Sequence, residues 1–393
     1  MEDSVAASAE ATETQAAGLL RRFSPDPERQ RKARQYAATS RCFFAAELVL
    51  GACFLIFLLL SGLSLWLRDL LGFPLPLQAA AYFVAVMACY GIVAAPITYY
   101  MGYVVPHRYG LSHQTFGSWL WDLEKGGFLA LMLGTVAVVV VYWLLAVFPE
   151  IWWLLAAAFL SFFSVVLTHL APLVVIPLFF KQEPLEDADL ARRLVSLAQR
   201  AHTKVCGVFV LDLSRKATAA NAALMGLGNT RRIVLTDTLF GQHSPDEIEV
   251  IVAHELGHHA HRDIARLIVV QTGLILLSFC LADLVLRAAV PMLGFAGIAD
   301  VASLPLFALV LVVFSLIVRP LDNAYSRRLE RLADLFALKL TGNREAFVSM
   351  MTKLTDQNLS EAEPGRWVEL FFYSHPPYAK RVTLAAEYSV GIG

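Results

Sequence analysis

The chain has 393 residues, of which 57% are hydrophobic and only 17% are charged. Soluble globular domains usually carry about 45–50% apolar and about 25% charged residues, so this composition excludes both a water-soluble enzyme and an intrinsically disordered chain. The formal net charge of −1 gives no basic field that would favour nucleic acid as a partner.

Six apolar runs are long enough to cross a bilayer as helices, which takes roughly 20 residues each. These runs are residues 43–67, 77–104, 127–148, 151–180, 264–289 and 303–320. Residues 1–42 form a polar N-terminal segment, and residues 43–180 a membrane domain with four spans. Residues 181–393 hold the last two spans and most of the polar sequence. We therefore predict an all-α polytopic membrane protein of about six transmembrane helices, with a small α/β element at the membrane surface.

Basic residues near the ends of the runs predict the orientation of the chain. Seven Arg and Lys precede the first run, and residues 105–126 and 181–263 hold more, whereas residues 290–302 hold none. Because such residues gather on the cytoplasmic side, both termini and both large polar regions are expected there. The membrane would be the inner membrane of a bacterium or the endoplasmic reticulum of a eukaryote.

Three ionisable residues lie inside the apolar runs, namely Glu47, His169 and Asp283. Charged groups in lipid are costly and usually face protein or water. Two interpretations stay open for each: it lines a hydrated cavity, or it hydrogen-bonds between helices.

The polar sequence between the fourth and fifth runs has mixed secondary-structure signals. Residues 187–202 have the pattern of an amphipathic helix, and residues 205–211 and 232–236 are rich in β-branched residues typical of short strands. Small polar residues fill the stretch between those strands. The sequence after the sixth run is predicted to be mostly helical.

A His-Glu-Leu-Gly-His motif carries the clearest chemical signature. Ser244, followed by proline and then by Glu247, predicts a helix start with a capping box. On that helix His254 and His258 lie one turn apart on one face, a spacing at which two imidazoles can bind one Zn²⁺. Glu255 is suited to polarise a metal-bound water, whose pKa zinc lowers to about 7. The alternative is a helix with several histidines at a membrane surface.

A catalytic zinc site also needs a third protein ligand and one open position. A histidine ten residues after the first is absent, because Ile264 stands there, and no glutamate occurs between Glu255 and Glu330. Glu330 follows the sixth run, and the two intervening runs form a hairpin that returns to the same side. Asp334, one turn further, is placed to accept a hydrogen bond from a ligand histidine. The alternative for Glu330 is a surface partner of the neighbouring arginines.

Three segments together make the chain resemble the type 1 CAAX prenyl proteases, which are integral-membrane zinc metallopeptidases of the gluzincin class, related more distantly to the HtpX-like proteases. They are the motif at residues 254–258, residues 326–337 (Ser-Arg-Arg-Leu-Glu-Arg-Leu-Ala-Asp-Leu-Phe-Ala) and residues 373–377 (Tyr-Ser-His-Pro-Pro). The resemblance implies one Zn²⁺ per chain, with His254, His258 and Glu330 as ligands and Glu255 as general base.

The resemblance also implies roles that spacing alone does not assign. Asn221 and Ala222 match a segment thought to form an edge strand that pairs with the substrate backbone. His375 and Arg381 match a segment that could stabilise the oxyanion of the tetrahedral intermediate. Eukaryotic members are described with seven spans, one more than predicted here, and the compact, Ala-, Leu-, Val- and Arg-rich chain is typical of a bacterial homologue.

The resulting hypothesis is a membrane-embedded zinc metalloendopeptidase of the CAAX prenyl protease 1 type. Its partners would be membrane lipid and a peptide or protein substrate that is prenylated or membrane-associated. One alternative is an HtpX-like endopeptidase for quality control of membrane proteins. Another is a non-catalytic zinc-binding scaffold or transporter, against which the intact Glu255 argues.

Overall fold

Long helices make up most of the fold. The computed structural model describes residue 18, residues 22–226 and residues 228–388, and within these it has six helices long and apolar enough to cross a membrane. They are Pro27–Leu60 (α2), Leu75–Arg108 (α4 to Tyr99, then η1 and α5), Phe116–Val147 (α6), Trp152–Phe179 (α7 to Leu170, then η2 and α8), Asp263–Leu293 (α11) and Val301–Thr341 (η5, then α12 from Leu304). The prediction of about six transmembrane helices is confirmed.

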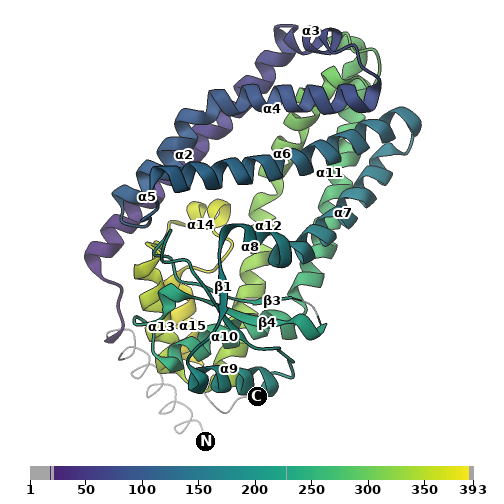
Figure 1. The fold of residues 1–393 in the computed structure, drawn as a ribbon. Coiled ribbons are helices and arrows are strands. Elements are labelled where there is room, and N and C mark those ends of the chain that lie inside the picture. Colours follow the sequence, from purple (N-terminus) through teal and green to yellow (C-terminus); the bar gives the residue numbers. More distant parts are fainter. Residues whose placement is uncertain (1–17, 19–21, 227, 389–393) are drawn as a thin grey trace, which may run out of the picture.

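The six helices close into a ring. In the order α2, α4, α6, α7, α11, α12 each contacts the next, and α12 contacts α2 again. Figure 1 shows the sheet and most of the shorter helices gathered beyond one end of this ring, with the short helix Leu63–Leu70 at the other end. The long helices therefore form one body, and the polar parts of the sequence assemble at its end.

The first predicted span differs from the helix that forms. α2 begins at Pro27, where the Asp26 carboxylate accepts hydrogen bonds from the backbone N–H groups of Glu28 and Arg29. It ends at Leu60, because Gly62 adopts a positive φ of 74° and starts the short helix α3 (Leu63–Leu70). Hydropathy detects only the apolar part of a helix, so it missed the polar first turns and ran past the break.

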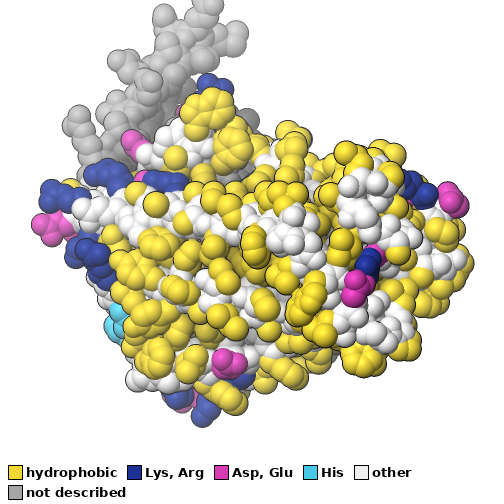
Figure 2. All heavy atoms as spheres, turned by 90° about the horizontal axis from the view of Figure 1, so that it is seen from above, with side chains coloured by type: hydrophobic (Ala, Val, Ile, Leu, Met, Phe, Trp, Pro, Cys, Tyr) yellow, Lys and Arg dark blue, Asp and Glu magenta, His cyan; other side chains and the backbone are white. Residues whose placement is uncertain are grey.

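Much of the surface of the helical ring is apolar. Figure 2 shows hydrophobic side chains over most of one face, with charged groups concentrated toward its margins. Leu60, Ile92 and Val269 are 76%, 76% and 72% exposed. Exposed apolar area on this scale is unfavourable in water and is expected of a surface that faces lipid.

The ionisable residues inside the spans have different surroundings. Asp283 of α11 is buried and accepts hydrogen bonds from Trp152 Nε1 on α7 (2.6 Å) and from Arg287 Nε. For Asp283 the interhelical interpretation is therefore confirmed. Glu47 instead lines an apolar cavity of about 380 Å³ between α2, α4 and α12.

A four-stranded sheet with strand order β1-β2-β4-β3 lies in the polar assembly. Its strands are Gln182–Pro184 (β1), Val208–Leu211 (β2), Ala222–Met225 (β3) and Arg232–Thr236 (β4). β2 and β4 are parallel, while β1 and β3 pair antiparallel to them and form the two edges. The strand predicted at residues 232–236 is confirmed, and the one predicted at 205–211 begins later, after Gly207. β3 arises in the small polar stretch, where the residue pattern predicted no strand and only the family resemblance implied one.

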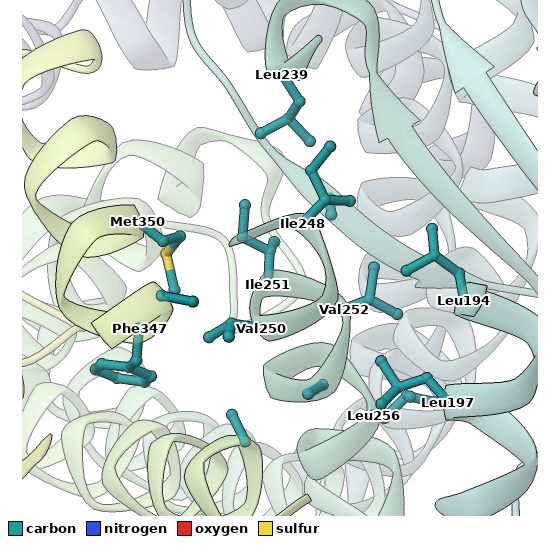
Figure 3. Close-up of a cluster of buried hydrophobic side chains, with 14 of the residues drawn as sticks. Leu194, Leu197, Leu239, Ile248, Val250, Ile251, Val252, Leu256, Phe347 and Met350 are labelled. Carbon is teal, nitrogen blue, oxygen red and sulfur yellow. The ribbon is translucent and has the colours of Figure 1, made fainter. Parts of the chain in front are cut away.

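Helix α10 (Pro245–Ala260) is the centre of the polar assembly, and the motif lies on it. The other helices here are Ala188–Arg200 (α9), Arg344–Gln357 (α13), Arg366–Phe372 (α14) and Tyr378–Glu387 (α15). Figure 3 shows Val252 and Leu256 of α10 on the side of α9, and Val250 and Ile251 of α10 on the side of α13. Fully burying each such side chain stabilises the fold by roughly 1.5–3 kcal/mol, so the motif is carried on a rigid element.

The start of α10 is fixed by the buried carboxylate of Glu247. The N–H of Ser244 donates to Glu247 Oε2 (2.7 Å), completing the predicted capping box. Ser349 Oγ donates to Glu247 Oε1 (2.5 Å) and Lys353 Nζ to Oε2 (2.8 Å), which ties α13 to α10. Burial alone would raise the pKa of Glu247, but the bonds from Lys353, Ser349 and Ser244 outweigh it and hold that pKa below its ordinary value.

We expect Glu247→Ala to lower the free energy of unfolding by about 3 kcal/mol, because three donors lose the buried acceptor that they share. Since the folded pKa is depressed, this stabilisation is fully present above the unfolded pKa of about 4.5 and is lost as the pH falls through the folded value. Thermal unfolding of the detergent-purified protein between pH 3.5 and 7 measures both the loss of stability in the variant and the dependence of that loss on pH. The control is Glu249→Ala, which removes only a surface pair with Arg193 and should cost under about 1 kcal/mol. Equal losses in the two variants would contradict this account.

Candidate metal centre

The His-Glu-Leu-Gly-His motif and Glu330 meet because α10 and α12 cross closely. At Gly257 an added Cβ would lie 3.1 Å from Ala333 Cα and 3.2 Å from Phe336 Cβ, tighter than ordinary van der Waals contact. Glycine therefore allows an approach that larger residues would obstruct. This crossing brings Glu330 of α12 against the histidines of α10.

The three donor groups lie close together, and each oxygen of the Glu330 carboxylate lies beside a different histidine. The Nε2 atoms of His254 and His258 are 3.2 Å apart. Glu330 Oε2 lies 3.2 Å from His254 Nε2, and Glu330 Oε1 lies 3.4 Å from His258 Nε2. Ligands that hold Zn²⁺ tetrahedrally at about 2.0–2.1 Å are themselves about 3.3–3.4 Å apart. The measured separations are close to this spacing, and one ligand atom from each of the three residues lies within 4.8 Å of the other two, so the cluster could hold a metal ion.

Glu330 has a further feature expected of a metal ligand. Its side chain is buried, and among the described residues its Oε2 atom has no hydrogen-bond partner. An unsatisfied buried carboxylate oxygen is unfavourable unless a cation or a donor is present. Two neutral imidazoles and one carboxylate are also a donor set that suits zinc, so the residues fit a metal ion.

Each histidine is oriented by a carboxylate at its other ring nitrogen. His254 Nδ1 lies 3.0 Å from Asp334 Oδ1, the contact expected from the sequence. His258 Nδ1 lies 2.9 Å from Asp263 Oδ2, which the sequence reasoning missed. Such carboxylates fix the tautomer and the direction of a ligand imidazole. A carboxylate in the first turn after the motif helix was the available signal for Asp263.

The carboxylates also change the acidity of the site. Burial by itself would lower the pKa of His254, but the neighbouring carboxylates of Asp334 and Glu330 outweigh it and raise the pKa to about 9. Glu330 and Asp263 likewise raise the pKa of His258. Burial raises the pKa of the Glu255 carboxyl against the opposing positive charge of the histidines. A metal ion that binds here has to displace the protons of the imidazoles.

The remaining predicted residues border one cavity of about 410 Å³. Asn221, His254, Glu255, His375 and Arg381 all line it. The structure therefore brings together side chains that are more than 150 positions apart in the sequence. Ala222, the first residue of β3, lies beside them at the edge of the sheet.

His375 and Arg381 differ in their contacts. His375 is 61% exposed at its side chain, and its Nε2 atom lies 3.2 Å from Glu330 Oε1. Arg381 instead donates from Nε and Nη2 to the two oxygens of Asp334, at 2.8 and 2.5 Å, and Nη2 lies 3.4 Å from His254 Nδ1. Arg381 thus holds the carboxylate that orients His254.

Two sequence families account for nearly the whole chain. The profile of peptidase family M48 matches residues 184–389, and that of the CAAX prenyl protease N-terminal region, described as five membrane helices, matches residues 19–181. The chain belongs to peptidase family M48. Residues 19–181 contain the four long helices α2, α4, α6 and α7 and the short helix α3.

Individual relatives agree with this assignment. An uncharacterized metalloprotease of Bacillus subtilis, YhfN, is 30% identical and covers 89% of this chain and 84% of its own length. The CAAX prenyl protease 1 homolog of Arabidopsis thaliana is 29% identical over 83% of this chain and 80% of its own. The crystal structure of S. mikatae Ste24p superposes with a TM-score of 0.82 at 25% identity, covering 96% and 95% of the two chains. The protein is an M48 membrane metalloprotease of the Ste24 type, which acts on a peptide or protein substrate.

Proposed function

We propose that this M48 protein is a zinc-dependent endopeptidase whose metal is held by His254, His258 and Glu330. The observation that supports this most directly is the cluster of donor atoms, one from each of these residues and all within 4.8 Å of one another, with Glu255 lining the same cavity as His254. Zinc bound there would polarise the scissile carbonyl and make a nucleophilic oxygen available near neutral pH. Asp334 and Asp263 keep the two imidazoles in the ligating orientation.

Glu255 is proposed as the general base and then the general acid. It takes a proton from the attacking water and gives that proton to the nitrogen of the peptide bond as the C–N bond breaks. Burial raises the pKa of this carboxyl toward the range in which it can both accept and return a proton at working pH.

His375 and Arg381 are proposed to donate hydrogen bonds to the oxygen that becomes negative during hydrolysis. The exposed side chain of His375 makes it the more direct donor. Arg381 uses two of its nitrogens on Asp334, so it would donate from the remaining Nη1 atom while keeping Asp334 in place.

The edge strand β3 is proposed to pair with the backbone of the substrate. β3 pairs with β4 on one side only, and its N-terminal end, at Asn221 and Ala222, lies at the catalytic cavity. Asn358, just after α13, makes two hydrogen bonds to the backbone of Ala220, which lies two residues before this strand. Its Oδ1 accepts from the Ala220 N–H (3.0 Å), and its Nδ2 donates to the Ala220 carbonyl (3.3 Å). Gln357 Nε2 donates to the carbonyls of Thr218 and Thr238.

We therefore expect Asn358→Leu to raise the KM for a peptide substrate about 5- to 10-fold with kcat reduced by less than twofold. The substitution removes two hydrogen bonds of about 1 kcal/mol each from the strand but touches no reacting atom. Steady-state kinetics on one quenched peptide separate the two constants. Asn358→Asp, which keeps the acceptor for Ala220 N–H, should fall between wild type and the leucine variant. A fall in kcat at unchanged KM would refute the positioning role.

Prenylated CAAX-type peptides are the proposed substrate class, by analogy with the relatives named CAAX prenyl proteases. The distribution of basic residues supports a zinc site on the cytoplasmic side, and the bacterial relative supports the inner membrane of a bacterium. The test compares cleavage of a farnesylated CAAX-type peptide with that of its unprenylated twin by the purified protein. A higher kcat/KM for the farnesylated peptide supports the proposal. Equal values would favour the quality-control endopeptidase instead.

A further inference from the structure

A second cavity, of about 810 Å³, lies on a different side of α10 from the catalytic cavity. It borders the junction where α10 ends and α11 begins, together with the ends of α9 and α12. Five basic residues line it: Arg200, His202, His259, Arg262 and Lys339. No aspartate or glutamate is among its lining residues in the described part of the chain. The cavity therefore carries three fixed positive charges in a protein whose formal net charge is −1.

Helix dipoles account for only part of this charge. Arg200 and Lys339 lie in the last turns of α9 and α12, and Arg200 donates to the Leu340 carbonyl, so both offset helix C-terminal dipoles. Arg262 lies between the C-terminal end of α10 and the N-terminal end of α11, whose dipoles act on it with opposite sign. Like charges gathered around one cavity repel each other and favour a bound anion.

The backbone around the cavity is held in an unusual conformation. In the described part of the chain three residues other than glycine have a positive φ, and two of them, His202 (54°) and Arg262 (56°), line this cavity. Such residues cost conformational energy and persist where the surrounding structure enforces them, often at binding sites. Each of these basic residues lies just after the C-terminal end of a helix, His202 after α9 and Arg262 after α10.

The surface of α11 beyond Arg262 identifies the kind of anion. Arg266, Val269, Gly273 and Leu276 follow at helical spacing and are all exposed, Val269 by 72%. Val269 lies seven residues beyond Arg262, which is about 10 Å along the helix. An exposed, increasingly apolar strip thus leads from the basic cavity into the span, as the acyl chains of a phospholipid lead away from its phosphate.

We propose that this cavity binds the phosphate headgroup of an anionic phospholipid, with an acyl chain lying along the Arg266–Leu276 face of α11. Basic cavities beside the cytoplasmic ends of transmembrane helices suit such headgroups, because the fixed cations pair with the phosphate while the helix covers the chain. Neither the metal centre nor the proposed cleavage reaction is needed for this site.

The test is lipid retention by the full-length protein in detergent, titrated with phosphatidylglycerol or phosphatidylcholine and measured by native mass spectrometry. We expect phosphatidylglycerol to bind at least about tenfold more tightly than phosphatidylcholine. The double variant Arg262→Gln, Lys339→Gln should weaken phosphatidylglycerol binding about 25-fold, or about fivefold for each charge removed. Lys339→Gln alone, which leaves the α10–α11 junction intact, should weaken it about fivefold.

The matched control removes the same charge elsewhere, in Arg192→Gln, Arg215→Gln, at side chains that are 79% and 69% exposed. Binding within twofold of wild type is expected there. An equal loss in the control, or no loss in the Arg262 and Lys339 variant, would overturn the proposal. Displacement of the lipid by 10 mM inorganic phosphate would also overturn it, since the site would then take free phosphate.

Discussion

Glu255→Gln is expected to lower the kcat of peptide hydrolysis by about 10³-fold without loss of the metal. The amide keeps the shape of the side chain but cannot accept the proton of the attacking water, and general-base catalysis contributes about 10²–10⁴-fold. Glu255 lines the cavity that His254 also lines, whereas the donor cluster is formed by His254, His258 and Glu330. The variant should therefore fold, bind zinc and bind substrate as the wild type does.

The measurement pairs steady-state hydrolysis of a quenched peptide with metal content by elemental analysis of the same samples. Glu249→Gln, on the same helix but paired at the surface with Arg193, is the control and should keep full activity. Residual activity above about a tenth of wild type in Glu255→Gln would assign the general base to another residue. Loss of metal together with activity would show that Glu255 supports the site rather than the proton transfer.

The sequence predicted that His254, His258 and Glu330 come together, because the main signals for this grouping are local. His254 and His258 are one turn apart, and the capping box of Ser244 and Glu247 predicts the start of the helix that carries them. Glu330 was found by exclusion, since no glutamate lies closer downstream, and the hairpin of two spans explained how it returns. What the sequence could not supply was the reason for the close crossing, a contact between Gly257 and Ala333 that joins two helices.

Other features depend on contacts between distant segments, which periodicity does not record. β3 becomes a strand because Ala222–Met225 pairs with β4, although its own residues have no strong strand pattern. Asn358 and Gln357 act on backbone groups about 120–140 positions away. The first span ended early because one glycine, Gly62, broke a run that was otherwise continuous in hydropathy.

Glu330→Ala is expected to abolish zinc binding in the micromolar range and all detectable hydrolysis. The remaining histidines lose the carboxylate that completes the donor cluster, and two imidazoles one turn apart bind zinc weakly on their own. The measurement is competition with a chelator of known affinity, followed by activity after zinc is restored. Glu345→Gln, a surface glutamate paired with Arg22, is the control.

Asp263→Ala distinguishes a residue that only orients a histidine of the site from a residue that itself binds the metal. Asp263 contacts His258 Nδ1 and does not belong to the donor cluster, and loss of such a partner lowers metal affinity about 10- to 100-fold. Excess zinc should therefore restore hydrolysis to Asp263→Ala, because mass action compensates a weakened site whose three ligands remain. The same excess should leave Glu330→Ala inactive, because no concentration of zinc replaces a missing ligand in the correct geometry. If both variants recovered, Glu330 would be a partner of the histidines rather than a ligand, and the third corner of the site would have to be sought at His375, whose Nε2 lies 3.2 Å from Glu330 Oε1.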